Sequence, residues 1–201
     1  MQIPAKNVDG WMSCPKTIIE HPGLAYLCYL NEIIVTKKLD ALHKIIGKAD
    51  VCYTIYNNED QKVFVGVKRT GCKSFAVKFF NNYGNEVIVI KKPFAFFANR
   101  AQVWAPPGNY VGCVEKKFAT NTFLVKNRNG DKVLNVKSQS SCCSDYDVLQ
   151  NDELVGHIKR WTVNSMPITS TDFAVSFPAQ MDINNKVILL GACFLIRYSK
   201  Y

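Results

Sequence analysis

The chain has 201 residues, of which 48% are hydrophobic, 20% are charged and 12% are aromatic. This composition excludes a disordered or collagen-like chain, and the length suits one domain of generous size. The formal net charge of +9 indicates a surface attracted to phosphate-bearing partners, either nucleic acid or the anionic leaflet of a membrane.

The first residues carry no pattern of a folded element. We expect residues 1–17 to form a short, flexible N-terminal segment and residues 18–201 to form a single domain. The stretch from Met1 to Pro15 lacks the pattern of a secretory signal, and the sequence contains no Asn-X-Ser/Thr acceptor. We therefore expect the eight cysteines to be free thiols in a reducing compartment, in a protein that is not secreted.

The segment from Ile33 to Ile46 is the first with a periodic pattern. Leu39, Leu42 and Ile45 recur at three-residue steps, which favours a short helix. The beginning of the same segment, Ile-Ile-Val at 33–35, is itself typical of a strand, so both interpretations stay open.

Four antiparallel hairpins are predicted in the middle of the chain. In each, an aromatic-led strand enters an Asn/Asp/Gly turn and returns as a Val-rich strand. Pro93, Pro106 and Pro107 mark breaks or edges, because proline cannot donate to a β-ladder. The repeat predicts a meandering all-β sandwich or barrel. The predicted strand pairs are 53–56 with 63–65, 75–80 with 87–90, 123–126 with 133–136, and 146–149 with 154–158.

The longest unbroken apolar run, Val187 to Ile196, comes last. It is too short to cross a hydrocarbon core unaided, which takes about 20 helical residues. A run that is apolar on every side predicts a helix enclosed by protein, over about 186–197, with Asn184 or Asn185 as N-cap; a long buried strand is the alternative. A barrel closed around this helix would have no aqueous channel. The predicted core or membrane-contacting residues are Val187, Leu190, Gly191, Phe194 and Ile196.

Four segments resemble, in order and approximate spacing, the landmarks of the phospholipid scramblase family. The resemblance extends from about Pro22 to Ile196 and implies the tubby-like fold: a twelve-stranded antiparallel β-barrel around a hydrophobic C-terminal helix. It also implies bidirectional, ATP-independent movement of phospholipids between membrane leaflets. The four segments are His21-Pro-Gly-Leu-Ala-Tyr-Leu27, Gln102-Val-Trp-Ala-Pro-Pro-Gly108, Phe173-Ala-Val-Ser-Phe-Pro178 and Leu190-Gly-Ala-Cys-Phe-Leu-Ile196.

The resemblance also implies a calcium-binding segment, which this chain matches only in part. In the matching stretch, 169–182, only Asp172 and Asp182 carry charge, and Thr169 and Thr171 stand where the family pattern has aspartates. Calcium takes 6 to 8 oxygen ligands, and its affinity follows the number of carboxylates. We therefore expect calcium binding to be weak or absent.

Basic doublets are the predicted contacts to lipid headgroups, although solvated strand ends are the alternative for any one of them. The headgroup candidates are Lys68, Arg69, Lys91, Lys92, Lys116 and Lys117.

The candidates for acylation are Cys142 and Cys143, because the cysteine cluster that family members carry before Ala-Pro-Pro-Gly is absent from residues 94–101. A segment resembling the importin-binding stretch of some scramblases, or else a strand with two exposed cations, comprises Gly156, His157, Ile158, Lys159, Arg160, Trp161 and Thr162.

The sequence contains no nucleophile elbow, phosphate-binding glycine loop or His-Glu-x-x-His motif, so an enzyme is the weaker prediction. The leading hypothesis is a phospholipid scramblase at the cytosolic face of the plasma membrane, with the cytoplasm and nucleus as further locations. The anionic phospholipid membrane is its predicted partner, and importin, DNA and a second copy of the chain are further candidates. The alternatives are a non-transporting anionic-lipid or phosphoinositide-binding module, a nuclear DNA-binding regulator, and a protein-interaction scaffold.

Overall fold

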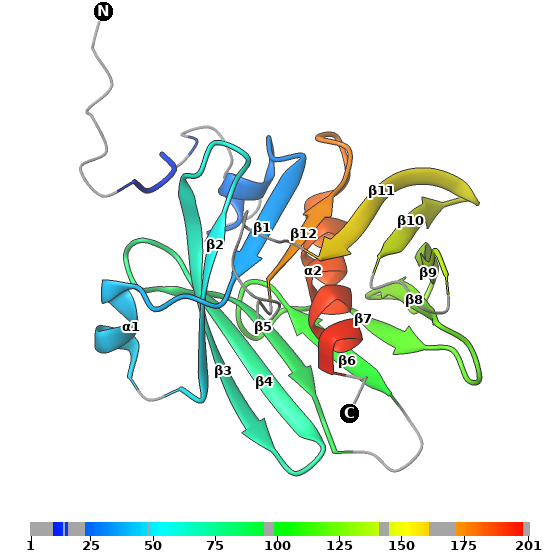
Figure 1. Ribbon diagram of the computed structural model, residues 1–201, viewed down its shortest axis with the longest axis horizontal. Coiled ribbons are helices and arrows are strands. Elements are labelled where there is room, and N and C mark those ends of the chain that lie inside the picture. The colour runs from blue at the N-terminus through cyan, green and yellow to red at the C-terminus, as the bar shows by residue number, and fades with distance from the viewer. Residues whose placement is uncertain are drawn as a thin grey trace, which may run out of the picture.

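The computed structural model describes residues 10–13, 15, 23–47, 49–94, 99–140, 145–160 and 172–198. Twelve antiparallel strands form a closed barrel around one long helix (Figure 1). Each strand pairs with its neighbour in the chain, and β12 pairs with β1 to close the barrel. The strands are β1 (Glu32–Thr36), β2 (Val51–Tyr56), β3 (Lys62–Gly71), β4 (Ser74–Phe80), β5 (Glu86–Lys92), β6 (Arg100–Trp104), β7 (Tyr110–Lys116), β8 (Thr122–Asn127), β9 (Lys132–Ser138), β10 (Tyr146–Gln150), β11 (Glu153–Arg160) and β12 (Phe173–Ser176), and the helices are the 3-10 helix η1 (Ala25–Leu27), α1 (Ala41–Ile46) and α2 (Ile183–Tyr198).

The predicted hairpins are confirmed as β2–β3, β4–β5, β8–β9 and β10–β11. Pro93 directly follows β5, and Pro106 and Pro107 lie in the turn between β6 and β7. The helix predicted over Ile33–Ile46 is wrong in its first part, where the Ile-Ile-Val run forms β1, and right in its last part, which forms α1.

Three of the hairpin turns share one asparagine motif. The side-chain oxygens of Asn57, Asn81 and Asn127 each accept hydrogen bonds from the backbone N–H groups two and four residues further on. These bonds satisfy N–H groups that the ladder leaves unpaired in the turn, which is the usual role of asparagine there. The repeated Asn-rich stretches of the sequence therefore encode three copies of one turn.

The helix α2 fills the barrel, as its apolar sequence predicts. Every residue from Lys186 to Ile196 is buried. A Cβ atom on Gly191 would lie 2.7 Å from Val103 Cγ2, and one on Gly112 of β7 would lie 2.6 Å from Ile188 Cδ1. These two glycines thus allow α2 to approach β6 and β7 closely. Among the described residues, no helix combines the length and hydropathy needed to cross a membrane.

Lys186 anchors the first turn of α2 from inside the protein. Its ammonium nitrogen donates hydrogen bonds to the carbonyl oxygens of Leu27 at 2.8 Å, Leu30 at 2.9 Å and Ala179 at 2.7 Å. The side chain is 1% exposed. Burial lowers the pKa of Lys186 to about 8, against the opposing influence of the nearby Cys28 and Asp182. One side chain therefore ties α2 to the segment before β1 and to the connection from β12.

The N-cap of α2 differs from the prediction. Asp182 Oδ1 accepts the N–H of Asn185 at 3.1 Å, and the Asp182 carbonyl accepts the N–H of Lys186 at 3.0 Å. Asn184 and Asn185 lie inside the helix, so Asp182 is the capping residue. The carboxylate also faces the positive end of the helix dipole, which favours aspartate over asparagine at this position.

At its other end, α2 is held by an aromatic contact to the barrel wall. The hydroxyl groups of Tyr53 and Tyr198 share a hydrogen bond, and Lys68 Nζ lies 3.6 Å from the centroid of the Tyr198 ring. Burial, together with the neighbouring Tyr198, raises the pKa of Tyr53. Because the C-terminal end of a helix carries partial negative charge, the Lys68 ammonium also complements the end of α2.

We predict that Lys186→Met lowers the free energy of unfolding by about 3 kcal/mol at pH 7, because several buried carbonyl groups lose their donor. Urea unfolding followed by circular dichroism measures this loss. Lys132→Met, at an exposed position on β9, is the matched control and should change stability by less than about 0.5 kcal/mol. Equal effects of the two substitutions would contradict the anchoring role of Lys186.

The pH dependence of this difference follows from the lowered pKa of Lys186. Between pH 8 and 10.5 the unfolded chain keeps the Lys186 proton while the folded protein loses it, so stability rises with pH across this window. Relative to Lys186→Met, the wild type should gain roughly 3 kcal/mol across it. Groups that do not interact with Lys186 contribute equally in both proteins and cancel in the comparison, and Cys28→Ser in both backgrounds removes the one thiol that does interact with it. Parallel stability curves for the two proteins would show that Lys186 keeps an ordinary pKa.

Candidate lipid-binding groove

The short helix α1 is fixed to the outer face of β3 by a histidine. Asp40 caps α1 by accepting the Leu42 N–H at 3.0 Å, and the Asp40 N–H donates to His43 Nδ1 at 2.8 Å. Since Nδ1 accepts this bond, Nε2 carries the hydrogen of the neutral ring and donates to the Gly66 carbonyl at 3.1 Å. His43 therefore connects the cap of α1 to the backbone of β3.

A salt bridge supports the same connection. Lys62 Nζ lies 3.1 Å from Asp40 Oδ2, and both side chains are largely buried. Burial alone would raise the pKa of Asp40, but the hydrogen bond from Leu42 and the Lys62 ammonium lower it. Asp40 therefore remains an anion that holds α1 at a fixed distance from β3.

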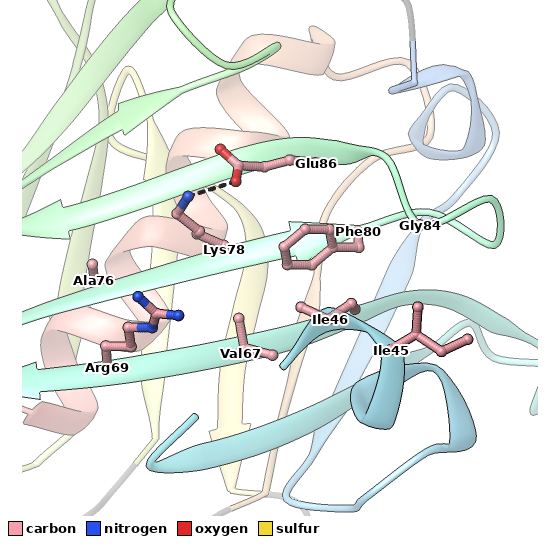
Figure 2. A pocket seen from close by; sticks show the side chains of 9 residues that line it. All are labelled: Ile45, Ile46, Val67, Arg69, Ala76, Lys78, Phe80, Gly84 and Glu86. Atoms are coloured by element: carbon pink, nitrogen blue, oxygen red, sulfur yellow. Dashed lines mark hydrogen bonds and ion pairs between the residues drawn. The ribbon is translucent and has the colours of Figure 1, made fainter. Parts of the chain in front are cut away.

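A groove of about 400 Å³ lies between α1 and the outer faces of β3 and β4 (Figure 2). Ile45 and Ile46 of α1 form one wall, and Val67, Ala76 and Phe80 form an apolar floor. This volume is within the usual range of small-molecule sites. The apolar floor is unusual for the outer face of a β-barrel, and Ile45 is 81% exposed above it.

The polar lining of the groove has an excess of positive charge. Lys78 Nζ lies 2.7 Å from Glu86 Oε2, so these two charges balance (Figure 2). The exposed Arg69 guanidinium forms no salt bridge with any acidic side chain in the part of the chain that the structure describes. The groove thus combines an apolar floor with the Arg69 cation, which suits a ligand that has an anionic group and a hydrocarbon part.

The predicted headgroup residues separate into three groups. Lys68 is 5% exposed and points into the barrel against Tyr198, which removes it from the residues that a headgroup at the surface could contact. Its neighbour Arg69 faces outward, because successive strand residues point to opposite faces, and lines the groove. The remaining four, Lys91, Lys92, Lys116 and Lys117, lie where β5 and β7 end.

The predicted calcium residues lie at opposite ends of β12. Asp172 precedes this strand and accepts the Lys37 N–H at 2.7 Å, whereas Asp182 follows it and caps α2. Thr169 and Thr171 lie outside the described residues. Within the described ranges, no group of three or more His, Cys, Asp or Glu side chains could hold a metal ion. The two described carboxylates thus do not form a common cation site, and weak calcium binding stays a prediction.

The segment that resembles an importin-binding stretch is built into the barrel as far as it is described. Residues 156–160 belong to β11 and pair with β10 and β12, with Lys159 and Arg160 exposed. His157 Nδ1 lies 2.9 Å from Asp147 Oδ1. Trp161, Thr162, Cys142 and Cys143 lie outside the described residues. The described cysteines, Cys28, Cys52, Cys72, Cys113 and Cys193, are free thiols.

Comparison with known proteins identifies the family. The model of the family described as Scramblase matches residues 12–201. The chain belongs to the scramblase family. The chain is 29% identical to phospholipid scramblase 1 of Rattus norvegicus, over 97% of its own length and 69% of the relative's. It is 28% identical to phospholipid scramblase 2 of Bos taurus, over 94% and 74% of the two lengths.

A solved structure is similar to the scramblase barrel in fold. It is the X-ray structure of a protein from Arabidopsis thaliana, which aligns with a TM-score of 0.54 at 12% identity. The alignment covers 86% of the scramblase chain and 93% of the plant protein. This likeness concerns the arrangement of the strands around the helix and carries no functional residue across.

The apolar floor of the groove was not predicted from the sequence. In β4, Phe79 points inward and Phe80 outward. The Phe-Phe pair therefore breaks the alternation of apolar and polar residues that is typical of a sheet with a solvent-exposed outer face. A large apolar residue at an outward position, followed by a turn, was a signal that could have been read. The sequence does not predict that Ile46 lines the same groove as Phe80, because no pattern in it places α1 beside β4.

We predict that Asp182→Ala lowers the free energy of unfolding of the scramblase by about 1 kcal/mol through loss of the helix cap. The loss should be the same with millimolar calcium and with a chelator, since the bond to Asn185 requires no metal. Thermal melts in both buffers measure it, with Glu153→Ala at an exposed strand end as control. A loss seen only in calcium would make Asp182 a metal ligand.

Proposed function

We propose that this chain moves phospholipids between the leaflets of a membrane without ATP, acting as a translocator rather than as an enzyme. The observation that supports this most strongly is the family match over residues 12–201, which includes all twelve strands and α2. Relatives aligned over nearly the whole chain are named phospholipid scramblases. We place the activity at the cytosolic face of the plasma membrane, where anionic lipids are concentrated.

The groove beside α1 is the proposed site of contact with a transferred lipid. The phosphate would lie against the Arg69 guanidinium, which forms charge-assisted hydrogen bonds with phosphate oxygens. Part of one acyl chain would lie along Ile46, Val67 and Phe80, where each buried methylene contributes about 0.8 kcal/mol. Both parts of a phospholipid thus find a complementary surface on the outside of the barrel.

A route along the outer surface fits the filled interior better than a route through it. Withdrawing α2 would expose its large apolar side chains, at a cost of roughly 10–20 kcal/mol. That cost equals or exceeds the whole stability of a typical domain, about 5–15 kcal/mol. We therefore propose that α2 stays inside the barrel while a lipid is handled at the surface. Calcium, for which the chain has few acidic ligands, would bind weakly and only modulate the transfer.

A non-transporting lipid-binding module is the second candidate function, because the groove by itself accounts for binding and not for transfer. In this case the protein would hold a single anionic lipid at the membrane surface. Binding without transfer distinguishes the two candidates experimentally.

We expect Arg69→Glu to slow phospholipid transfer about ten-fold, because a charge-assisted hydrogen bond contributes about 1.5–3 kcal/mol. The measurement is the dithionite-accessible fraction of fluorescent phospholipid in vesicles reconstituted with the purified chain. Arg128→Glu is the matched control: it makes the same change in net charge in the β8–β9 turn, away from the groove.

Three outcomes separate the candidates. Transfer by the wild type and by Arg128→Glu, but not by Arg69→Glu, supports the groove as the lipid site. Transfer that is equal in all three proteins would contradict the groove. Folded, vesicle-bound wild type without transfer would eliminate the transporter and leave the binding module.

A further inference from the structure

The two ends of the barrel differ in charge. We call the end where β3, β5 and β7 finish the basic end, and the end where β2, β4 and β8 finish the acidic end. Among described residues near the basic end, the cations include Lys37, Lys38, Arg69, Lys73, Lys91, Lys92, Lys116, Lys117, Lys159, Arg160 and Arg197. The described connections and strand ends at the acidic end carry the acidic residues Glu32, Glu59, Asp60, Glu86, Asp131, Asp152, Glu153 and Asp182, and the cations Lys62, Lys78, Lys126, Arg128 and Lys132.

The carboxylates at the basic end are already engaged within the protein. Asp50, Asp145 and Asp172 each accept a backbone N–H group. Glu115 lies 2.6 Å from Lys126 Nζ and 3.4 Å from Arg100 Nε. The cations also outnumber these four carboxylates, so the field outside this end is positive.

A fully exposed phenylalanine stands at the tip of this end. Phe118, in the turn between β7 and β8, is 94% exposed and directly follows Lys116 and Lys117. A single exposed apolar residue would need no explanation. Phe118 does not stand alone, because Phe94, directly after Lys91, Lys92 and Pro93, is 48% exposed in the neighbouring connection.

The two phenylalanine-bearing connections are adjacent in space. The Lys116 N–H donates to the Asn99 carbonyl at 2.9 Å, and Arg100 pairs with Glu115. The Lys92 ammonium donates to the Lys73 carbonyl at 2.9 Å, which joins the β3–β4 turn to the same surface. Cations and phenylalanines thus form one face at the basic end.

The turn that carries Phe118 does not follow ordinary turn chemistry. Ala119 has φ 58°, a left-handed conformation in which glycine or asparagine is normally found. The asparagine turns at the acidic end, by contrast, use side chains that stabilise the turn. Residues that break a local rule without a structural gain are expected at functional sites.

We propose that the basic end docks on an anionic membrane surface and inserts Phe118 below the headgroups. Lysines beside a protruding phenylalanine suit an interface that is anionic outside and apolar beneath. Nucleic acid is the other polyanion, but Phe118 and Phe94 lie in separate turns and line no described groove that could follow a phosphate backbone. Arg69 lies near this end, so docking would also bring the Arg69 side of the groove toward the bilayer.

This inference is independent of lipid transfer, because docking is measured as binding alone. The experiment compares Phe118→Ser with Tyr83→Ser in co-sedimentation with vesicles of 30% phosphatidylserine and 70% phosphatidylcholine at about 0.1 M salt. Tyr83 is the matched control, since it is a 74% exposed aromatic in a turn at the acidic end. Both substitutions lie in exposed turns, and unchanged melting temperatures would verify that the proteins fold.

We expect Phe118→Ser to weaken binding about ten-fold through loss of the buried ring, and Tyr83→Ser to leave it unchanged within a factor of two. Equal affinities of the two variants would overturn the docking face. Stronger binding to a 20-nucleotide single strand than to the vesicles, with the same dependence on Phe118, would also overturn it in favour of a nucleic-acid surface.

A second measurement tests insertion directly. Phe118→Trp and Tyr83→Trp add one tryptophan each to the same background, and brominated lipid quenches only tryptophans that reach the acyl region. We expect additional quenching in Phe118→Trp alone. Absence of that quenching in vesicle-bound protein would overturn insertion, whatever the rate of lipid transfer.

Discussion

The enclosure of one wholly apolar helix is the constraint on which the rest of the molecule depends. A helix without a polar face cannot lie on a surface, so the sheet must close around it. Closure leaves each strand paired on both sides, and Gly112 and Gly191 permit the helix to lie close to the wall. Lys186 supplies the polar contacts that an apolar helix otherwise lacks. Because the interior is filled, chemistry directed at partners is confined to the outer surface and the two ends.

Much of the fold could be predicted because its signals are periodic. The four hairpins follow from alternation and Asn/Asp/Gly turns, and the central helix follows from an apolar run too long for an ordinary strand. The residues that failed prediction are those whose role is set by distant partners. Lys186 directly precedes the apolar run in the sequence, yet the carbonyl groups of Leu27 and Leu30 hold it inside the protein. Asp182 caps α2 because the helix begins one turn earlier than its apolar residues do.

The surface features were only half predictable for a similar reason. Basic doublets identify cations, but the strand period sends one member of the pair 68–69 inward and the other outward, and the sequence does not say which. The groove exists because His43 reaches Gly66, a contact across 23 residues that no local pattern encodes. The difference in charge between the two ends of the barrel depends on the strand order, which brings alternate connections together at each end.

The position of α2 after all twelve strands has a consequence for biosynthesis. A chain made from its N-terminus offers the strands of the barrel to solvent before the helix that fills them exists. The first and last strands must also find each other across the whole sheet, since β1 pairs with β12. Such long-range pairing is slow, and the unfilled sheet exposes apolar edges in the meantime. Closure of the barrel and burial of its apolar face therefore both depend on segments that are synthesised after most of the strands.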